Sequence, residues 1–312
     1  MKDSDADRPC RLCGAPSAPA FVVGDRNRGL GPGRFEYRTC SACSAIFIVE
    51  PPADLGRYYA PDGYGSADEQ ISPELEKRER AKVELLRPFV PRGRMVEIGP
   101  GPGLFTRVAK ADGFQVTAIE MDGNYCRHLE DVLGVSVIQS DAPSDVLPTL
   151  PPSDAIVMWH AVEHLSDPWA VLESCAENLR VGGVLAISTP NPQSLQFRLL
   201  RSRWVHLDAP RHLQLIPLDT LKRRLLERGL RVVETTTTDP VGKELNLMGW
   251  ERALRSGSSR TPTRLSELGG IVLTVVARGI ERRGLAGATY TALFVRAEPG
   301  GRDASLDRWS AR

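Results

Sequence analysis

A glycine-rich bend that directly follows a short apolar run constrains the fold of this chain more than any other feature. The run Met95 to Ile98 leads into glycines at positions 99, 101 and 103, called here the glycine loop, and then into an apolar helical pattern. This order predicts a buried strand that turns tightly into a helix, because a side chain in the loop would block close approach of a ligand. Six more apolar runs alternate with helical stretches downstream. We therefore expect an α/β, Rossmann-like, doubly wound fold with a seven-stranded, mostly parallel sheet.

The sequence also predicts the bounds of the strands, a helix before the sheet and an insertion between its last two strands. The expected strands cover 95–99, 115–120, 135–139, 155–160, 184–189, 231–236 and 289–297. A charged amphipathic helix is expected over 73–90, before the sheet begins. An insertion of about 240–285 separates the last two strands, and its apolar part is shorter than the roughly 18 residues of a spanning helix. We expect that part to form a buried or interfacial helix.

Overall charge and the amino terminus narrow the function classes. The 312 residues carry a formal net charge of only +1, which provides no global field for gathering nucleic acid. Nucleic acid is therefore not favoured as a partner. The first ten residues are polar and acidic, with no apolar segment of a secretory signal. We expect a cytoplasmic protein without a membrane span, and its oligomeric state stays open.

Acidic residues accompany the ends of three successive strands. Glu97 precedes the glycine loop by two residues, Glu120 ends the second strand, and Asp141 follows the third. An acid beside the loop would repel a pyrophosphate but attract the charged amino group of a methionine moiety. The second acid has the usual position for ribose hydroxyls, and the third could accept an adenine amine. Each acid could also stand there only because strand ends face solvent.

The glycine loop and these acids, taken together, resemble the class I S-adenosylmethionine-dependent methyltransferase family over residues 90–240. In that family an ExGxGxG loop, a ribose acid and an adenine acid occupy these successive strand ends. The resemblance implies S-adenosyl-L-methionine as the cofactor. It implies contacts from Glu97, Gly99, Gly101, Gly103, Glu120, Met121, Asp141, Ala142, Trp159 and His160.

The segment HAVEHLSDP, residues 160–168, is similar to the ubiquinone-biosynthesis-like branch of this family. The similarity implies that Trp159 and His160 line the methionine end of the cofactor and that His164 faces the acceptor. Because an unperturbed histidine has a pKa of about 6.5, His164 suits a general base. Two other interpretations stay open. The segment also fits the HxxEH pattern of inverzincin metallopeptidases, and His160, Glu163 and His164 could hold a divalent metal. Glu163 could instead cap the next helix.

A second polar cluster precedes the helical pattern that begins near residue 218. Residues 204–225 resemble the WxxxDxPRHLxxFTxxTLxxLL segment of class I methyltransferases acting on small molecules or glycans, with Ile216 and Pro217 in place of Phe and Thr. The resemblance implies a lid over the acceptor formed by Trp204, His206, Asp208, Arg211 and His212. Arg211 and His212 of this lid, together with His160 and His164, are the candidate catalytic residues. The alternative is a local ion pair between Arg211 and Asp208, with His212 packed against the helix.

Two CxxC pairs near the amino terminus predict a zinc ribbon. Cys10 and Cys13 are separated by 26 residues from Cys40 and Cys43. Two such knuckles supply the four tetrahedral ligands of a closed structural Zn²⁺ site. A redox dithiol is less suitable, since a CxxC of that kind belongs near a βαβ unit. The ribbon resembles that of sugar C-methyltransferases, although we do not expect their long carboxyl-terminal domain in these 312 residues.

The sequence thus predicts a zinc ribbon at 8–50, a linker and amphipathic helix at 51–91, a methyltransferase domain at 92–299 and a polar tail at 300–312. The expected reaction is O-, N- or C-methylation of a small-molecule or glycan intermediate. A catalytically inactive ribbon and Rossmann scaffold is the first alternative. The second is RNA methylation, which draws on the ribbon and on the basic run LKRRLLERGLR, residues 221–231.

Overall fold

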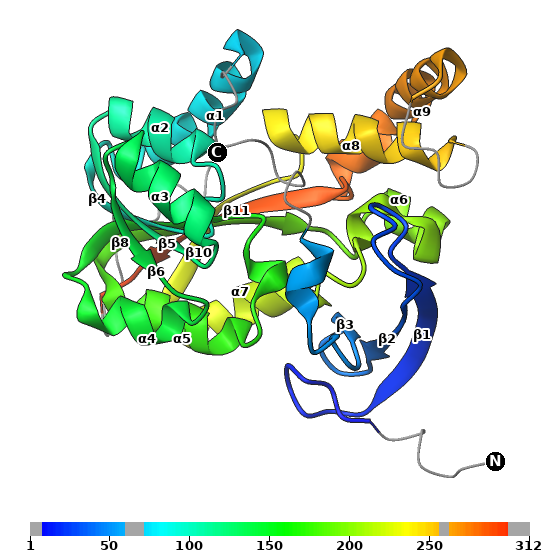
Figure 1. Cartoon of the computed structure of the whole chain (residues 1–312), viewed down its shortest axis with the longest axis horizontal. Helices are drawn as coiled ribbons and strands as arrows, with labels where there is room; N and C mark the ends of the chain where they lie inside the picture. Colours follow the sequence, from blue (N-terminus) through cyan, green and yellow to red (C-terminus); the bar gives the residue numbers. More distant parts are fainter. Residues whose placement is uncertain (1–7, 60–71, 256–261, 299–312) are drawn as a thin grey trace.

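The computed structural model describes residues 8–59, 72–255 and 262–298 (Figure 1). Its centre is a seven-stranded sheet of order β10-β11-β8-β7-β4-β5-β6. Only β11 runs antiparallel to its neighbours, β8 and β10. The strands are β4 Gly93–Ile98, β5 Phe114–Glu120, β6 Ser136–Gln139, β7 Ser153–Trp159, β8 Leu179–Pro190, β10 Leu230–Thr236 and β11 Thr289–Arg296. The expected α/β, mostly parallel, seven-stranded fold is confirmed.

Helices cover both faces of this sheet. The α-helices of the described residues are α1 Pro73–Leu86, α2 Leu104–Ala111, α3 Gly123–Asp131, α4 Pro143–Val146, α5 Pro168–Asn178, α6 Leu195–Leu200, α7 Leu218–Leu226, α8 Pro240–Ala253 and α9 Arg264–Arg283. Side chains alternate along a strand, so Met95 packs toward α1, α2 and α3 while Val96 packs toward α5 and α7. Figure 1 shows the two helical layers on opposite sides of the sheet. Strands buried on both faces explain the continuous apolar runs of the sequence.

The helix expected over 73–90 ends earlier, at Leu86. Ser72 caps its first turn by accepting a hydrogen bond from the Leu75 N–H. Arg87 still has helical dihedral angles and donates to the Val83 carbonyl. The helix ends there because Pro88 has no N–H with which to continue the hydrogen-bond ladder. The expected extent was therefore four residues too long.

The amino-terminal segment forms a second, four-stranded sheet of order β1-β2-β3-β9. Its strands are β1 Ser17–Gly24, β2 Arg34–Cys40, β3 Ile46–Ile48 and β9 Gln214–Leu215. The last strand comes from the segment that also carries His212, so the small sheet is completed from outside the expected ribbon range of 8–50. This sharing joins the cysteine-bearing segment to the large domain.

The expected insertion of 240–285 contains the two helices α8 and α9. The carboxyl-terminal part of α8 contacts α9, because Glu251 accepts a hydrogen bond from Ser266 and Trp250 donates one to Glu281, and α9 touches the rest of the molecule much less (Figure 1). Across the described ranges, no helix combines the length and apolarity needed to cross a membrane. The expected tail, 300–312, and residues 60–71 of the expected linker lie outside the described residues.

Candidate active site

The glycine loop lies at the carboxyl end of β4 and has a left-handed backbone at each glycine. The φ angles are +69° at Gly99, +56° at Gly101 and +75° at Gly103. A Cβ on Gly99 would lie 3.1 Å from the Cβ of Ala161, and one on Gly103 would lie 2.5 Å from a Leu129 methyl carbon. A Cβ on Gly101 would meet nothing within 4 Å. The loop is thus held from two sides and open at Gly101, where a ligand can approach the backbone.

Glu120 connects the glycine loop to the end of β5. Its Oε2 accepts a hydrogen bond from the Gly101 N–H at 3.0 Å. Its Oε1 accepts from the backbone N–H groups of Met121 and Asp122, at 2.8 and 2.9 Å. The Glu120 carbonyl in turn accepts from the Ser140 N–H at the end of β6. The carboxyl ends of β4, β5 and β6 therefore meet at one edge, as parallel neighbours must.

The residues expected to contact the adenine differ in their environment. Asp141 is exposed just beyond β6, and Met121 is 58% exposed just beyond β5. The N–H of Ala142, one of the expected cofactor contacts, donates to Ser140 Oγ at 3.0 Å. That hydrogen bond must open before Ala142 can take the expected role.

Glu97 lies under the glycine loop rather than beside it. It is 3% exposed, and Thr106 Oγ1 of α2 donates a hydrogen bond to its carboxylate. Burial raises the pKa of Glu97 to about 7, although the Thr106 hydrogen bond and the charge of Lys82 oppose the shift. The Lys82 Nζ of α1 also lies 5.1 Å from the ring centroid of Trp159, the last residue of β7. A cation and an aromatic face thus stand near Glu97.

His160 and Glu163 form a hydrogen-bonded pair where β7 ends. His160 has a φ of +56°, and its Nδ1 lies 3.2 Å from Glu163 Oε1. Thr189 Oγ1 donates to the other carboxylate oxygen at 2.9 Å. Burial alone would keep Glu163 protonated, but the His160 hydrogen bond and the nearby histidines outweigh it and lower the pKa of Glu163 to about 2. An ionised carboxylate therefore orients the imidazole of His160, whose side chain is 28% exposed.

His164 has a different environment. Its Nδ1 lies 3.0 Å from the Tyr59 hydroxyl and 3.1 Å from the Arg211 carbonyl oxygen. Its ring packs edge-on against His212, with 4.7 Å between centroids. Burial and the neighbouring His212 lower the pKa of His164 to about 4. A histidine with so low a pKa is a weak proton acceptor at neutral pH, and this environment favours His160 over His164 as the general base.

The second polar cluster is mostly buried, and its role as a lid over the acceptor stays a prediction. Trp204, His206, Arg211 and His212 are at most 8% exposed, and the Asp208 side chain is 15% exposed. Arg211 Nη2 lies 2.8 Å from Asp25 Oδ1 and 2.7 Å from Asp208 Oδ1, and its Nη1 donates to the Tyr58 carbonyl. The ion pair with Asp208 is the local alternative raised by the sequence. His212 differs from that alternative, because its ring packs on His164.

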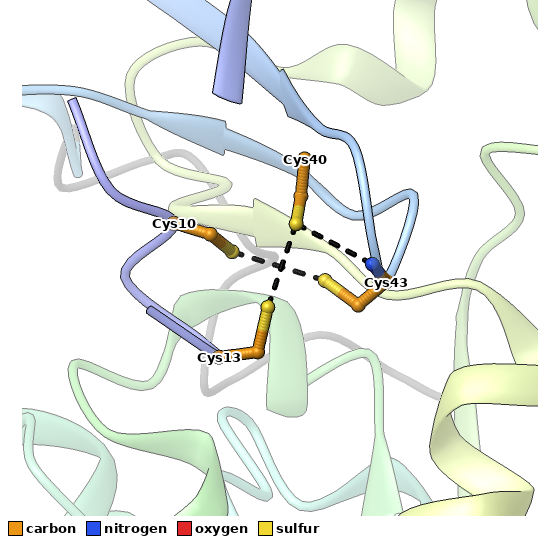
Figure 2. Close-up of side chains that lie close together, drawn as sticks. All are labelled: Cys10, Cys13, Cys40 and Cys43. Atoms are coloured by element: carbon orange, nitrogen blue, oxygen red, sulfur yellow. Dashed lines mark hydrogen bonds between the residues drawn. The ribbon is translucent and has the colours of Figure 1, made fainter. Parts of the chain in front are cut away.

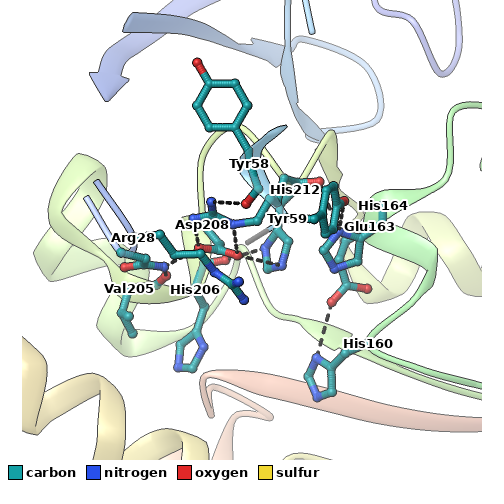
Figure 3. A network of polar contacts seen from close by, with 12 residues as sticks. Arg28, Tyr58, Tyr59, His160, Glu163, His164, Val205, His206, Asp208 and His212 are labelled. Carbon is teal, nitrogen blue, oxygen red and sulfur yellow. Dashed lines mark hydrogen bonds and ion pairs between the residues drawn. The ribbon is translucent and has the colours of Figure 1, made fainter. Parts of the chain in front are cut away.

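Three residues of this region are close enough to hold a metal ion. Ligand atoms of Glu163, His164 and His212 lie within 4.8 Å of one another. In Figure 3, Glu163 stands between His164 and His160. His160 is not part of this set, so the expected trio of His160, Glu163 and His164 is replaced by one that includes His212. The inverzincin interpretation is wrong, since it requires both histidines on one helical face and only a single 3-10 turn, Val162–His164, is present.

The four cysteines of the CxxC pairs converge on one point (Figure 2). The Sγ atoms of Cys10 and Cys43 are 3.8 Å from each other, and those of Cys13 and Cys40 are 3.4 Å from each other. All four residues are free thiols. Tetrahedral zinc with Zn–S bonds of about 2.3 Å requires S–S separations of about 3.8 Å. A hydrogen bond from the Cys43 thiol lowers the pKa of Cys10 to about 5, which favours the thiolate. The donor set fits a closed structural zinc site.

The zinc site contacts the large domain directly. The Trp169 indole N–H of α5 donates to the Leu12 carbonyl at 2.7 Å. Thr220 Oγ1 of α7 donates to the Cys43 carbonyl at 2.8 Å. Both cysteine knuckles are therefore tied to helices on one face of the sheet. Cys126 and Cys175 are buried elsewhere as free thiols.

Sequence reasoning missed several residues of this region. Asp25 and Asn27 lie in the turn after β1, and they contact Arg211 and Asp208 from 186 and 181 residues away. Tyr59 reaches His164 from the expected linker. The aromatic run around Tyr59 was a visible signal, whereas the turn at residues 25–27 offered none beyond its polar composition.

A separate pocket of about 470 Å³ opens at the opposite edge of the sheet. Residues at its rim include Arg94, Gln115 and Ser153, near the amino ends of β4, β5 and β7. Ligands of parallel sheets bind at the carboxyl ends of the strands, so this pocket is not part of the candidate site.

Comparison with known proteins places the glycine loop and the HAVEH segment in one family. Residues 71–235 match a family model described as a methyltransferase domain. The ubiquinone biosynthesis O-methyltransferase of Xanthomonas campestris pv. campestris (strain B100) is 31% identical over 118 residues, which are 36% of this chain and 49% of the relative. That of Xylella fastidiosa (strain 9a5c) is 35% identical over 112 residues, 34% of this chain and 45% of the relative. The chain thus spans about half the length of the curated relatives it matches.

The chain is also similar to solved structures, with lower sequence identity than to the curated relatives. A "SAM dependent methyltransferase" from Archaeoglobus fulgidus has a TM-score of 0.48 and 22% identity, and the match covers 70% of this chain and 96% of that one. The family match is the stronger finding, because it covers more than half of the chain and contains the glycine loop, Glu120, Asp141 and His160. This chain belongs to the methyltransferase-domain family, of the class I, S-adenosylmethionine-dependent type.

Proposed function

We propose that this protein transfers the methyl group of S-adenosylmethionine to an oxygen, nitrogen or carbon of a small-molecule or glycan acceptor. One observation carries the proposal. The open, left-handed glycine loop, bonded to Glu120, stands next to the end of β7, where an ionised carboxylate orients His160. Cofactor and acceptor sites would thus meet at adjacent strand ends. The O-methyltransferase names of the matched relatives support a small-molecule acceptor.

The residues at the carboxyl edge fit the cofactor. The backbone at Gly101 is accessible where a Cβ would stand in the ligand's space, and Glu120 lies within hydrogen-bond distance of that loop. Glu120 would hold the ribose and Asp141 the adenine, while Trp159 would line the methionine end. When bound, S-adenosylmethionine supplies an activated methyl group on a sulfonium. The protein then has to align the acceptor and remove its proton.

His160 is the proposed proton acceptor. Glu163 holds Nδ1, so the proton would be taken at Nε2, which lies 3.4 Å from the Ser188 hydroxyl. Ser188 Oγ is 3.2 Å from Thr291 Oγ1, which donates to Asp239 Oδ2 at 3.1 Å. These hydroxyls could pass the proton from His160 to a carboxylate at the start of α8. In this scheme Arg211 and His212 position their neighbours and do not touch the acceptor.

Titration calorimetry with S-adenosylmethionine and with S-adenosylhomocysteine tests the cofactor site. We expect Gly101→Val and Asp141→Ala each to abolish binding while zinc content stays at one per chain. Asp131→Ala changes an exposed acid at the end of α3 and should leave binding unchanged. Retained binding in both site variants would place the nucleotide elsewhere.

The other functions proposed from the sequence have distinct outcomes. A catalytically inactive scaffold would bind neither form of the cofactor. An RNA methyltransferase would bind RNA with an affinity that falls steeply with salt, through residues such as Arg223 and Arg224. The test for transfer is therefore methylation of candidate small molecules by the wild type and by His160→Gln. We expect His160→Gln to lower kcat at least about a hundredfold when the cofactor is saturating.

The proposal extends to organisation and location. We assign the ribbon to 8–50, the linker and helix to 51–91, the catalytic domain to 92–299 and a tail to 300–312. The ribbon would hold one structural zinc. A site of four reduced thiols suits a cytoplasmic enzyme, because thiols are kept reduced there. Cell fractionation of the full chain would test the location.

A further inference from the structure

Helix α9 exposes an apolar stripe that no described part of the chain covers. Each large side chain of the stripe is at least half exposed, up to 83% at Leu265. The members are Leu265, Leu268, Ile271, Val272, Val275, Val276 and Ile280. The opposite side of α9 is occupied, since Ser266 bonds to Glu251 of α8 and Ala277 is buried. Figure 1 shows the hairpin of α8 and α9 at the periphery of the molecule. A stripe of this size on a helix marks an interaction surface.

The spacing of the stripe is that of a helix-to-helix seam. Leu265, Leu268, Val272, Val275 and Gly279 follow one another at intervals of three and four residues. This is the repeat by which two helices interlock their side chains. Gly279 continues the seam, and a Cβ added there would meet nothing within 4 Å. Glycine inside an exposed helix costs about 0.5–1 kcal/mol relative to alanine, so its presence suits a close approach by a second backbone.

Charges beside the stripe are arranged for an antiparallel partner of the same sequence. Glu267 and Arg278 are exposed and 11 residues apart, which is close to three helical turns, so they lie along one edge of the stripe. The midpoint between them falls between Val272 and Leu273, which is also the midpoint between Leu265 and Ile280. A two-fold axis at this midpoint would bring Glu267 of each copy level with Arg278 of the other. A parallel pairing would instead put Glu267 of each copy level with Glu267 of the other, so this opposite-charge pair could not form.

We propose that α9 is the interface through which two copies of this chain pair, antiparallel and about a two-fold axis. The charges beside the stripe are self-complementary about this axis, as those of an isologous interface must be. It contains only leucine, isoleucine and valine. A membrane-surface helix commonly carries aromatic anchors among its apolar residues, and α9 has none.

Sedimentation equilibrium of the full chain tests the pairing. The wild type should sediment as a dimer, and Val272→Glu and Val275→Glu should each raise the dissociation constant at least tenfold. Val132→Glu is the matched control, because Val132 is also 60% exposed but lies at the end of α3. It should leave the dimer intact. Circular dichroism and zinc content would show that each variant is folded.

Charge reversal provides the sharper test. Glu267→Arg alone and Arg278→Glu alone should each weaken the dimer several-fold, and the double variant should restore it. A monomeric wild type at every concentration, or a dimer unaffected by the glutamate variants of the stripe, would overturn the proposal. Flotation of a monomeric chain on vesicles of phosphatidylcholine and phosphatidylglycerol, abolished by Val272→Glu, would assign the stripe to lipid instead.

Discussion

The substitution Asp25→Asn should loosen the attachment of the zinc-bearing segment to the catalytic domain. Asp25 and Arg211 have no exposed side-chain surface, and their 2.8 Å ion pair joins segments 186 residues apart. The carboxylate also accepts the N–H groups of Arg28 and Leu30, so it holds its own turn together. Removing one partner of a buried pair costs about 3–5 kcal/mol. Because Arg211 keeps its ion pair with Asp208, we expect a cost at the lower end of this range, about 3 kcal/mol.

Urea denaturation at pH 7 measures this cost as a lower midpoint at unchanged m-value. The control is Glu76→Gln, since Glu76 and its partner Arg80 are 49% and 45% exposed along α1. Water screens the charges of such an exposed helical pair, so its loss should lower the stability only slightly. A loss as small as that for Asp25→Asn would refute the reasoning. So would additivity with Arg211→Gln, because two residues that interact must show a coupling energy.

The same variant has a defined pH dependence. Burial raises the pKa of Asp25, but hydrogen bonds from Arg211 and the turn outweigh it, and the net effect lowers the pKa. A group whose pKa is lower in the folded state stabilises the protein above its unfolded pKa, about 3.9 for aspartate. That stabilisation disappears as the pH falls through the folded pKa. The difference between wild type and Asp25→Asn should therefore shrink below about pH 4.

Three further variants test the zinc site, the glycine loop and the buried acid. Cys43→Ser should reduce zinc from one per chain to none by elemental analysis and open the ribbon to proteolysis, whereas Cys126→Ser should keep its zinc. Gly103→Ala should lower the free energy of unfolding by about 2–4 kcal/mol in urea denaturation, because a left-handed φ combines with a 2.5 Å clash. Gly113→Ala should lower it only by the cost of the left-handed backbone, since a Cβ there meets nothing within 4 Å. Equal losses in the two variants would contradict the clash. Burial raises the pKa of Glu97 to about 7, so the stability it provides is complete below about pH 4.5 and is lost as the pH rises through 7. The free energy of unfolding of Glu97→Gln, relative to that of the wild type, should thus rise by up to about 3 kcal/mol from pH 5 to pH 8. A difference that does not change with pH would reject this assignment.

The amino-acid sequence by itself determined the features that depend on local pattern. The strand order along the chain, the turn at Gly99 to Gly103 and the acid at Glu120 follow from apolar periodicity and from the freedom of glycine at positive φ. The four zinc ligands follow from two CxxC turns, because each turn brings its own thiolates together wherever it lies. Such features need only a few neighbouring residues.

Tertiary structure decided which polar groups are desolvated and which are brought together. His160 and His164 look alike in the segment HAVEH, yet burial beside His212 lowers the pKa of His164, while Glu163 holds His160 at the strand end. Arg211, expected at the acceptor, meets Asp25 instead, from a turn with no recognisable motif. Desolvation and charge pairing depend on segments far apart in the chain. Their effects appear only once the whole fold has placed those segments side by side.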